Sequence, residues 1–165
     1  MDASSHKVLV ITTGGTLDKI YFDARSTYEV GTSIVDRLLA QANVRVSCEI
    51  VELMRKDSLD LDDGDRQRIH DVVSAADTSH IIVTHGTDTM TETAAHLADI
   101  TGKTVVLTGA LAPARFADSD AMFNLGMAFA AVQVAPPGIY IAMNGRVFDA
   151  AHVHKDRALN AFVDD

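Results

Sequence analysis

The stretch that decides the fold lies near the start of the chain and reads Val8-Leu9-Val10-Ile11-Thr12-Thr13-Gly14-Gly15-Thr16. A continuous run of β-branched and aliphatic residues is typical of a parallel strand that is buried on both faces. The paired glycines after it indicate a tight turn. That turn would present the Thr16 hydroxyl at the carboxyl end of the strand, where open α/β sheets bind their ligands. Taken alone, the tetrapeptide 13–16 favours an ordinary strand–turn connection, and only a second motif can favour catalysis.

A second unit of the same kind lies in the middle of the chain. The apolar residues of 79–84 predict a strand, which ends at the turn His85-Gly86-Thr87-Asp88-Thr89. Thr89 and Glu92 have the spacing of a capping box, which predicts a helix. That helix is expected to turn its apolar residues inward, namely Met90, Ala94, Leu97 and Ala98. The chain therefore passes twice from a strand through a glycine turn to a threonine.

Strands and helices are expected to alternate along the rest of the chain. Strands are predicted at 7–13, near 44–53, at 79–84, at 103–108 and at 139–143. Helices are predicted from Thr32 or Ser33 to Ala42, from the acidic cluster 60–65 to about Ala76, and from Asp118 or Ser119 to Val132. Residues 17–31 show no clear period and are expected to form a long loop, which in a compact domain is often a functional lid. The polar residues 144–165 are not assigned.

This alternation without internal repeats predicts an α/β fold. We expect residues 1–165 to form a single domain with a mainly parallel sheet, helices on both faces and right-handed crossovers. By analogy with flavodoxin/Rossmann-like folds, the first and third strands would lie side by side at the switch point of the sheet. Thr16 and Thr87 would then face one crevice.

Composition excludes several classes of partner. With 14 basic and 23 acidic residues, the net charge of −9 disfavours nucleic acid and anionic membranes as partners. A content of 47% hydrophobic and 22% charged residues indicates a folded chain. The single cysteine, Cys48, is predicted to be a buried core thiol. The segment before Val8 and the apolar run after it are too short for a signal or membrane helix, so a cytoplasmic location is expected.

The two turns together carry a resemblance to a known family. Thr13-Gly14-Gly15-Thr16 and His85-Gly86-Thr87-Asp88-Thr89 resemble the paired signature motifs of the bacterial-type L-asparaginase/glutaminase family, in the same order and separation. Weaker similarities extend over nearly the whole chain, at Tyr28-Glu29-Val30-Gly31, Gly109-Ala110, Phe123-Asn124-Leu125 and Met143-Asn144. Most members are about twice as long. The chain resembles the short single-domain form, an N-terminal-type catalytic domain that lacks the C-terminal domain of longer members.

The resemblance implies an amidohydrolase that converts L-asparagine to L-aspartate and ammonia, with L-glutamine as a further substrate. By position in the motifs, Thr16 would be the nucleophile that forms an acyl-enzyme. Thr87, Asp88 and Lys155 would form a supporting relay. Asp88 would also bind the α-ammonium group of the substrate.

The remaining roles rest on looser matches. The family uses a loop tyrosine to polarise the nucleophile. Tyr28 fits the motif best, whereas Tyr21 lies nearer the nucleophile in the sequence. For the α-carboxylate the family uses a serine two residues before an aspartate. Here Asp57 matches the aspartate, Arg55 occupies the serine position, and Ser58 is the substitute.

Elementary chemistry supports these roles independently. A hydroxyl is a weak nucleophile until a neighbouring group accepts its proton, and a lysine serves as that base only when its pKa is lowered. The glycine turns at Gly15 and Gly86 would bind the substrate. Backbone N–H groups of Gly15 and Thr87 would stabilise the oxyanion by about 3–4 kcal/mol per donor. No cofactor or metal is required, and His152 and His154 lack a third ligand.

Other interpretations stay open. The chain could be a non-catalytic amino-acid-binding domain or a subunit of an amidotransferase assembly; a nucleotide-binding module is less well supported because the phosphate fingerprints are missing. The apolar helix 122–132 and the absent C-terminal domain predict a homo-oligomer. In longer members that domain, from a neighbouring subunit, completes the site. Candidates to complete it here are Asp156, Arg157 and Asn160, from the same chain or a partner.

Overall fold

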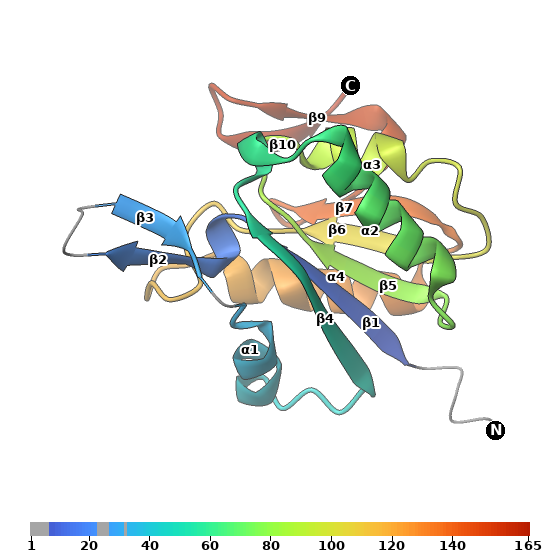
Figure 1. Cartoon of the computed structure of the whole chain (residues 1–165), viewed down its shortest axis with the longest axis horizontal. Helices are drawn as coiled ribbons and strands as arrows, with labels where there is room; N and C mark the ends of the chain where they lie inside the picture. The colour runs from blue at the N-terminus through green and yellow to red at the C-terminus, as the bar shows by residue number, and fades with distance from the viewer. Residues whose placement is uncertain (1–6, 23–26, 32) are drawn as a thin grey trace.

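The computed structural model describes residues 7–22, 27–31 and 33–165, and its centre is a six-stranded sheet (Figure 1). The strand order is β4-β1-β5-β6-β7-β8. The strands are β1 (Val8–Gly14), β4 (Cys48–Lys56), β5 (His80–Thr84), β6 (Thr104–Thr108), β7 (Gly138–Met143) and β8 (Arg146–Asp149). The first five run parallel, and β8 is antiparallel to β7. The predicted parallel α/β sheet, with the first and third predicted strands side by side, is confirmed.

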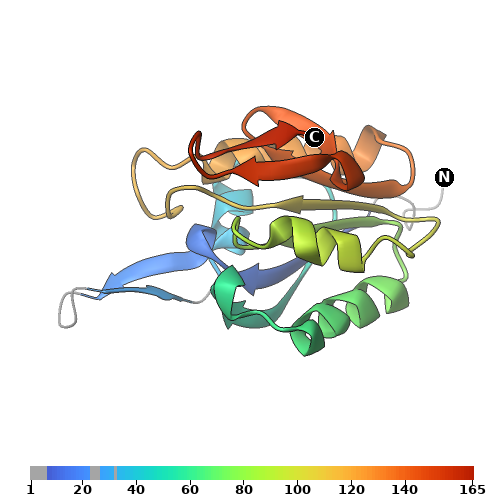
Figure 2. The same cartoon turned by 90° about the horizontal axis from the view of Figure 1, so that it is seen from above.

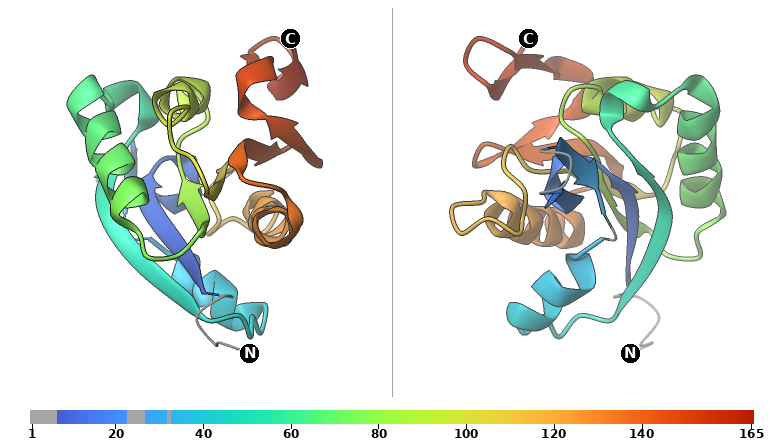
Figure 3. Two further views of the ribbon diagram at one scale, coloured as in Figure 1. Left: turned by 90° about the vertical axis from the view of Figure 1, so that its right-hand side faces the viewer. Right: turned by 60° about the vertical axis from the view of Figure 1, so that its left-hand side comes forward.

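Helices cover both faces of the sheet (Figure 3). On one face lie α2 (Asp63–Ala75) and α3 (Met90–His96), and on the other lie α1 (Val35–Gln41) and α4 (Ala121–Val134). Alternate residues of β1 enter the two cores: Leu9 and Ile11 face α2 and α3, whereas Val8 and Val10 face α1 and α4. The unbroken apolar run of this strand therefore reflects burial on both sides.

A two-stranded ribbon projects from the body of the protein (Figure 2). It consists of β2 (Lys19–Phe22) and β3 (Thr27–Val30), which pair antiparallel and follow the short 3-10 helix η2 (Thr16–Asp18). The expectation of an irregular loop at 17–31 was wrong. Each strand has only four residues, too few to show a period, although β-branched and aromatic side chains favour strands.

The unassigned C-terminal residues also form regular structure. Asn144 and Gly145 have φ values of 53° and 74° and make the two-residue turn between β7 and β8. After β8 come the 3-10 helix η4 (Ala150–His152) and a second ribbon of β9 (Val153–Asp156) and β10 (Ala161–Asp164). The Phe162 N–H donates to Asn144 Oδ1 at 2.8 Å. An Asn-Gly pair is a strong hairpin signal, although residues 144–165 were left unassigned from the sequence.

One predicted capping box is wrong and another forms. Thr89 precedes α3, but its hydroxyl donates to the Ser58 carbonyl oxygen at 2.7 Å instead of capping the helix. Glu92 pairs with Arg66 at 3.1 Å. Both side chains therefore bind residues from other parts of the fold and do not cap the helix. In α2, by contrast, Asp62 and Asp65 form a capping box, in agreement with the predicted acidic first turn.

Several smaller expectations also need correction. Cys48 is half-buried at the edge strand β4, and burial raises the pKa of its thiol. Ala98 is exposed, because α3 ends at His96. α1 begins at Val35, whose N–H donates to Ser33 Oγ, while Thr32 lies outside the described residues.

Within the described residues, no helix is long and apolar enough to cross a membrane. Nor does that part of the chain contain a group of three or more His, Cys, Asp or Glu side chains placed to hold a metal ion.

Candidate active site

The two glycine turns are in direct contact at the carboxyl ends of β1 and β5. Gly15 has φ 83°, and a Cβ built on it would lie 2.5 Å from the Gly86 backbone nitrogen. Only glycine permits both this conformation and this approach. Thr16 follows Gly15 as the first residue of η2, and Thr87 follows Gly86. The structure therefore brings the two predicted threonines to the same edge of the sheet.

A third turn, after β4, packs against these two. The Gly15 N–H donates to the Lys56 carbonyl oxygen at 2.9 Å. Ser58, which is buried in the 3-10 helix η3 (Ser58–Asp60), lies against Gly86: a Cβ on that glycine would be 2.7 Å from Ser58 Oγ. The ends of β4, β1 and β5 are thus held together by one backbone hydrogen bond and by close packing at the two glycines.

Lys155 reaches this edge from the C-terminal ribbon. Its Nζ donates to Thr87 Oγ1 and to Asp88 Oδ1, both at 2.8 Å. The Lys155 side chain is 13% exposed, and that of Asp88 is 36% exposed. Thr87 Oγ accepts this bond, which leaves its own hydrogen free to turn toward a ligand. The three residues assigned to a relay by the resemblance are therefore in contact.

A second ion pair lies at the turn after β4. Lys19 Nζ is 2.8 Å from Asp57 Oδ2. Burial raises the pKa of Asp57, but hydrogen bonds from Lys19 and from the Leu59 and Ser58 N–H groups outweigh it and hold that pKa below its usual value. Arg55, at the family's serine position, is bound to Glu52 at 2.6 Å. The sequence did not predict this ion pair, because no local pattern joins Lys19 to Asp57.

The two candidate tyrosines are register partners across the ribbon, Tyr21 in β2 opposite Tyr28 in β3. Their side chains lie outside what the structure describes. The role of either tyrosine beside Thr16 stays a prediction.

Asp18 anchors the base of the ribbon. Its carboxylate is buried and accepts the Ile34 N–H at 3.0 Å. Its carbonyl oxygen accepts the Gly31 N–H at 2.9 Å and Arg115 Nη1 at 3.2 Å. Burial raises the pKa of this carboxyl. Sequence reasoning treated Asp18 as a loop residue, since burial of a charge two residues after Thr16 has no local signal.

His85 braces the second turn from inside the protein. Its Nδ1 is 2.6 Å from the Gly86 carbonyl oxygen, and its Nε2 is 2.7 Å from Thr93 Oγ1. A carbonyl only accepts, so Nδ1 carries the hydrogen and Nε2 accepts from the threonine hydroxyl. Burial lowers the pKa of His85 to about 4. The ring is neutral at physiological pH and holds the turn.

The tail residues suggested to complete the site lie at the end of β9, for Asp156, and in the turn between β9 and β10, for Arg157 and Asn160. Asp156 Oδ1 accepts the N–H groups of Ala158 and Leu159 at 2.8 and 3.0 Å. Arg157 and Asn160 are exposed, and Asn160 has φ 49°. The Asp156 carboxylate is thus used to shape this turn.

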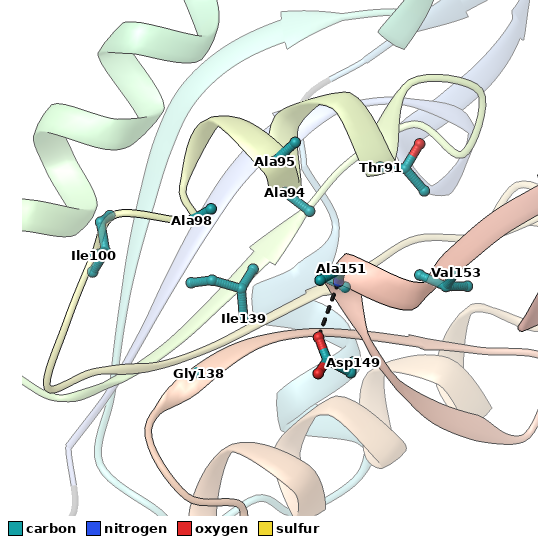
Figure 4. Close-up of a pocket in the computed structure, with 11 residues that line it drawn as sticks. Thr91, Ala94, Ala95, Ala98, Ile100, Gly138, Ile139, Asp149, Ala151 and Val153 are labelled. Atoms are coloured by element: carbon teal, nitrogen blue, oxygen red, sulfur yellow. Dashed lines mark hydrogen bonds between the residues drawn. The ribbon is translucent and has the colours of Figure 1, made fainter. Parts of the chain in front are cut away.

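A groove of about 450 Å³ lies elsewhere, between α3 and η4 (Figure 4). Its lining is mostly apolar, with Ala94, Ala98 and Ile139 among its residues. Asp149 faces it, but its carboxylate accepts the Ala151 N–H at 3.0 Å. This groove suits a zwitterion less well than the charged edge at the glycine turns.

The sequence of the chain matches a known protein family over nearly its whole length. The family model described as "Asparaginase, N-terminal" matches residues 7–163. The chain belongs to the asparaginase family.

Two relatives of this asparaginase family align with more than nine-tenths of the chain. An L-asparaginase of Thermococcus kodakarensis is 31% identical, over 94% of this chain and 50% of the relative. A glutaminase-asparaginase of Acinetobacter glutaminasificans is 27% identical, over 91% of this chain and 50% of the relative. The chain therefore spans about half the length of these curated relatives.

Solved asparaginase structures have the same fold. The thermostable L-asparaginase from Thermococcus kodakarensis superposes with a TM-score of 0.83 and 30% identity, over 96% of this chain and 51% of that chain. A probable cytoplasmic L-asparaginase from Campylobacter jejuni gives a TM-score of 0.82 and 25% identity, over 97% and 52% of the two chains. The single-domain organisation of residues 1–165 stays a prediction.

Proposed function

We propose that this chain is an L-asparaginase that hydrolyses the side-chain amide of L-asparagine to L-aspartate and ammonia. The observation that carries the proposal is the contact of Lys155 with Thr87 and Asp88, beside the joined glycine turns that carry Thr16. Membership of the asparaginase family supports an amidohydrolase of this type. Family members are also named glutaminase-asparaginases, so L-glutamine is a second candidate substrate.

The proposed reaction has two steps. Thr16 Oγ attacks the amide carbon, its proton passes to a neighbouring base, and the oxyanion is held by the backbone N–H group of Thr87. The Gly15 N–H, the other donor expected from the sequence, is bound to the Lys56 carbonyl oxygen instead. The C–N bond then breaks, ammonia leaves with a proton from the relay, and an ester remains on Thr16. Water hydrolyses that ester and restores the threonine. The base is a ribbon tyrosine, Tyr21 or Tyr28, or the relay through Thr87 and Lys155.

Charges at the edge suit an amino acid. Asp88 binds Lys155 through Oδ1 and has its second oxygen for the α-ammonium group of the substrate. Asp57 and Ser58 lie at the opposite turn, where the α-carboxylate end would be held. No metal or cofactor takes part in this scheme.

We also propose that the chain is a homo-oligomer that uses the outer face of α4. Phe123 is 64% exposed and Val134 is 82% exposed on that helix. The sequence of α4 contains no charged residue, in a chain with a net charge of −9. Two copies that meet there bury apolar surface without bringing acidic groups together.

The cytoplasmic location stays a prediction. Relatives carry both descriptions: the Campylobacter jejuni structure is titled a probable cytoplasmic L-asparaginase, and a relative from Haemophilus influenzae is named a probable periplasmic one.

Ammonia release tests the proposed activity. L-asparagine and L-glutamine are offered to the wild-type chain, to Thr16→Ala and to Thr87→Ala. Thr101→Ala changes an exposed threonine in the connection to β6 and serves as the matched control. The proposal expects release by the wild type and the control, and loss of about 100-fold or more in both site variants.

Two outcomes would contradict the proposal. Thr16→Ala with the wild-type rate would remove Thr16 as the nucleophile. Calorimetry that shows asparagine binding without turnover by the wild type would instead indicate a non-catalytic amino-acid-binding domain or an amidotransferase subunit.

A further inference from the structure

The Lys19–Asp57 ion pair joins the two chain segments that are hydrogen-bonded to the turn that carries Thr16. The Lys19 N–H donates to the Thr16 carbonyl oxygen, which closes η2. On the other side, Gly15 donates to the carbonyl oxygen of Lys56, the residue before Asp57. The side chains of Lys19 and Asp57 then meet at 2.8 Å. Both charged groups are therefore within one residue of a backbone hydrogen bond to the Gly15–Thr16 turn.

The two members of the pair differ in freedom. Asp57 is fixed, because its Oδ1 accepts the Leu59 N–H at 3.1 Å while Oδ2 holds the lysine. Lys19 has a long side chain with three donors, and 24% of it is exposed. A partly exposed ion pair contributes little to stability because water screens its charges, so the Lys19 ammonium can also bind a ligand at little cost.

The turn that carries Thr16 follows β1, which lies between β4 and β5 in the sheet. Asp88, after β5, binds Lys155 through Oδ1, and among the described residues its second oxygen has no partner, so it can accept from a cation. Asp57, after β4, binds Lys19, whose remaining donors can bind an anion. A zwitterion laid across Thr16 meets an acceptor for its ammonium group and a donor for its carboxylate.

We propose that Lys19 is a specificity-determining residue that binds the α-carboxylate of the substrate while it keeps its bond to Asp57. This inference rests on the proposed function, since it concerns the same site. The two cations that precede Asp57 have other partners: Arg55 is bound to Glu52 and Lys56 is bound to Asp65. Lys19 thereby makes the enzyme selective for free amino acids over amides that lack an α-carboxylate.

Three small amides test the contribution of each charged group of asparagine separately. L-asparagine has both charged groups, β-alaninamide lacks the α-carboxylate, and succinamate lacks the α-ammonium group. Ammonia release from each is measured with the wild type, Lys19→Met and Lys19→Arg. Lys7→Met is the matched control, because Lys7 forms a similar ion pair with Glu49 at the opposite end of β1.

The proposal expects Lys19→Met to raise KM for asparagine and succinamate roughly 10- to 100-fold, as expected for loss of a charge-assisted hydrogen bond. KM for β-alaninamide changes far less, because this amide has no α-carboxylate to bind Lys19. The preference for asparagine over β-alaninamide is therefore lost in Lys19→Met. Lys19→Arg keeps the cation and retains the preference. Lys7→Met behaves as the wild type.

Other results overturn the inference. If Lys19→Met lowers kcat equally for all three amides with KM unchanged, Lys19 only supports the turn. If Lys19→Met keeps the wild-type preference, the α-carboxylate is bound elsewhere.

Failure of the proposed activity itself is recognised separately. A wild-type chain that releases no ammonia from any amide refutes the hydrolase, and Lys19 is then tested by calorimetry of asparagine and β-alaninamide binding. Asparagine bound in preference by the wild type, with the preference lost in Lys19→Met, supports the inference. Equal binding of the two amides by the wild type overturns it.

Discussion

Gly15 and Gly86 touch backbone to backbone: a Cβ on Gly15 would lie 2.5 Å from the Gly86 nitrogen and 2.6 Å from its Cα. This contact links the turns after two neighbouring parallel strands, β1 and β5. It therefore sets how closely Thr16 and Thr87 can approach one another. The separation of the two threonines depends on the absence of a side chain at Gly15.

Replacement of Gly15 by alanine is expected to abolish activity. It should also lower the free energy of unfolding by more than the backbone strain of an alanine at positive φ can explain. Gly102→Ala is the matched control, because Gly102 also has positive φ, at 72°, but has no atom within 4 Å of a built Cβ. The control should cost about 1–2 kcal/mol from left-handed strain. Gly15→Ala adds the clash, about 1–3 kcal/mol more. Urea denaturation measures both, and equal losses would contradict a tight contact.

The turns and the strand order could be predicted because their signals are local. The apolar run 8–11 and the glycines beside it lie within a few residues of one another. The hairpin at Asn144-Gly145 also had a local signal that was overlooked. The Lys19–Asp57 pair could not be predicted in this way, since it joins side chains from different elements. Thr89 and Glu92 failed as a capping box for the same reason, because Ser58 and Arg66 bind them in the fold.

Acid should destabilise the protein through His85. Burial lowers the pKa of His85 from 6.5 to about 4, so between these values the unfolded chain binds a proton that the folded protein does not. The contribution of His85 to the free energy of unfolding is therefore complete above pH 6.5 and falls as pH drops toward 4. The shift corresponds to a loss of about 3 kcal/mol.

Urea denaturation across this pH range measures the effect. His85→Gln should lose that part of the pH dependence, although it is less stable at neutral pH because Gly86 and Thr93 lose a partner. His152→Gln, at an exposed position in η4, should keep the wild-type slope. Identical slopes in the wild type and His85→Gln would refute the assignment.

Asp18 should contribute to stability through its hydrogen bond more than through its charge. Asp18→Asn keeps an oxygen to accept the Ile34 N–H and removes a carboxylate whose ionised form is disfavoured by burial, which raises its pKa. We expect Asp18→Asn to be at least as stable as the wild type above neutral pH. Asp18→Ala leaves the Ile34 N–H unpaired and should lose about 1–3 kcal/mol. Thermal or urea unfolding compares the three, and an asparagine variant as unstable as the alanine variant would show that the charge is required.

The outer face of α4 should hold the oligomer together. Phe123→Glu and Val134→Glu each place a charge on an apolar surface that is covered in the proposed assembly, and burial of an unpaired charge is costly. We expect each variant to shift the protein toward monomer while its circular dichroism spectrum is unchanged. Leu159→Glu is the control, because Leu159 is 67% exposed in the turn between β9 and β10, away from α4. Light scattering at micromolar concentration measures the mass, and a monomeric wild type would refute the assembly.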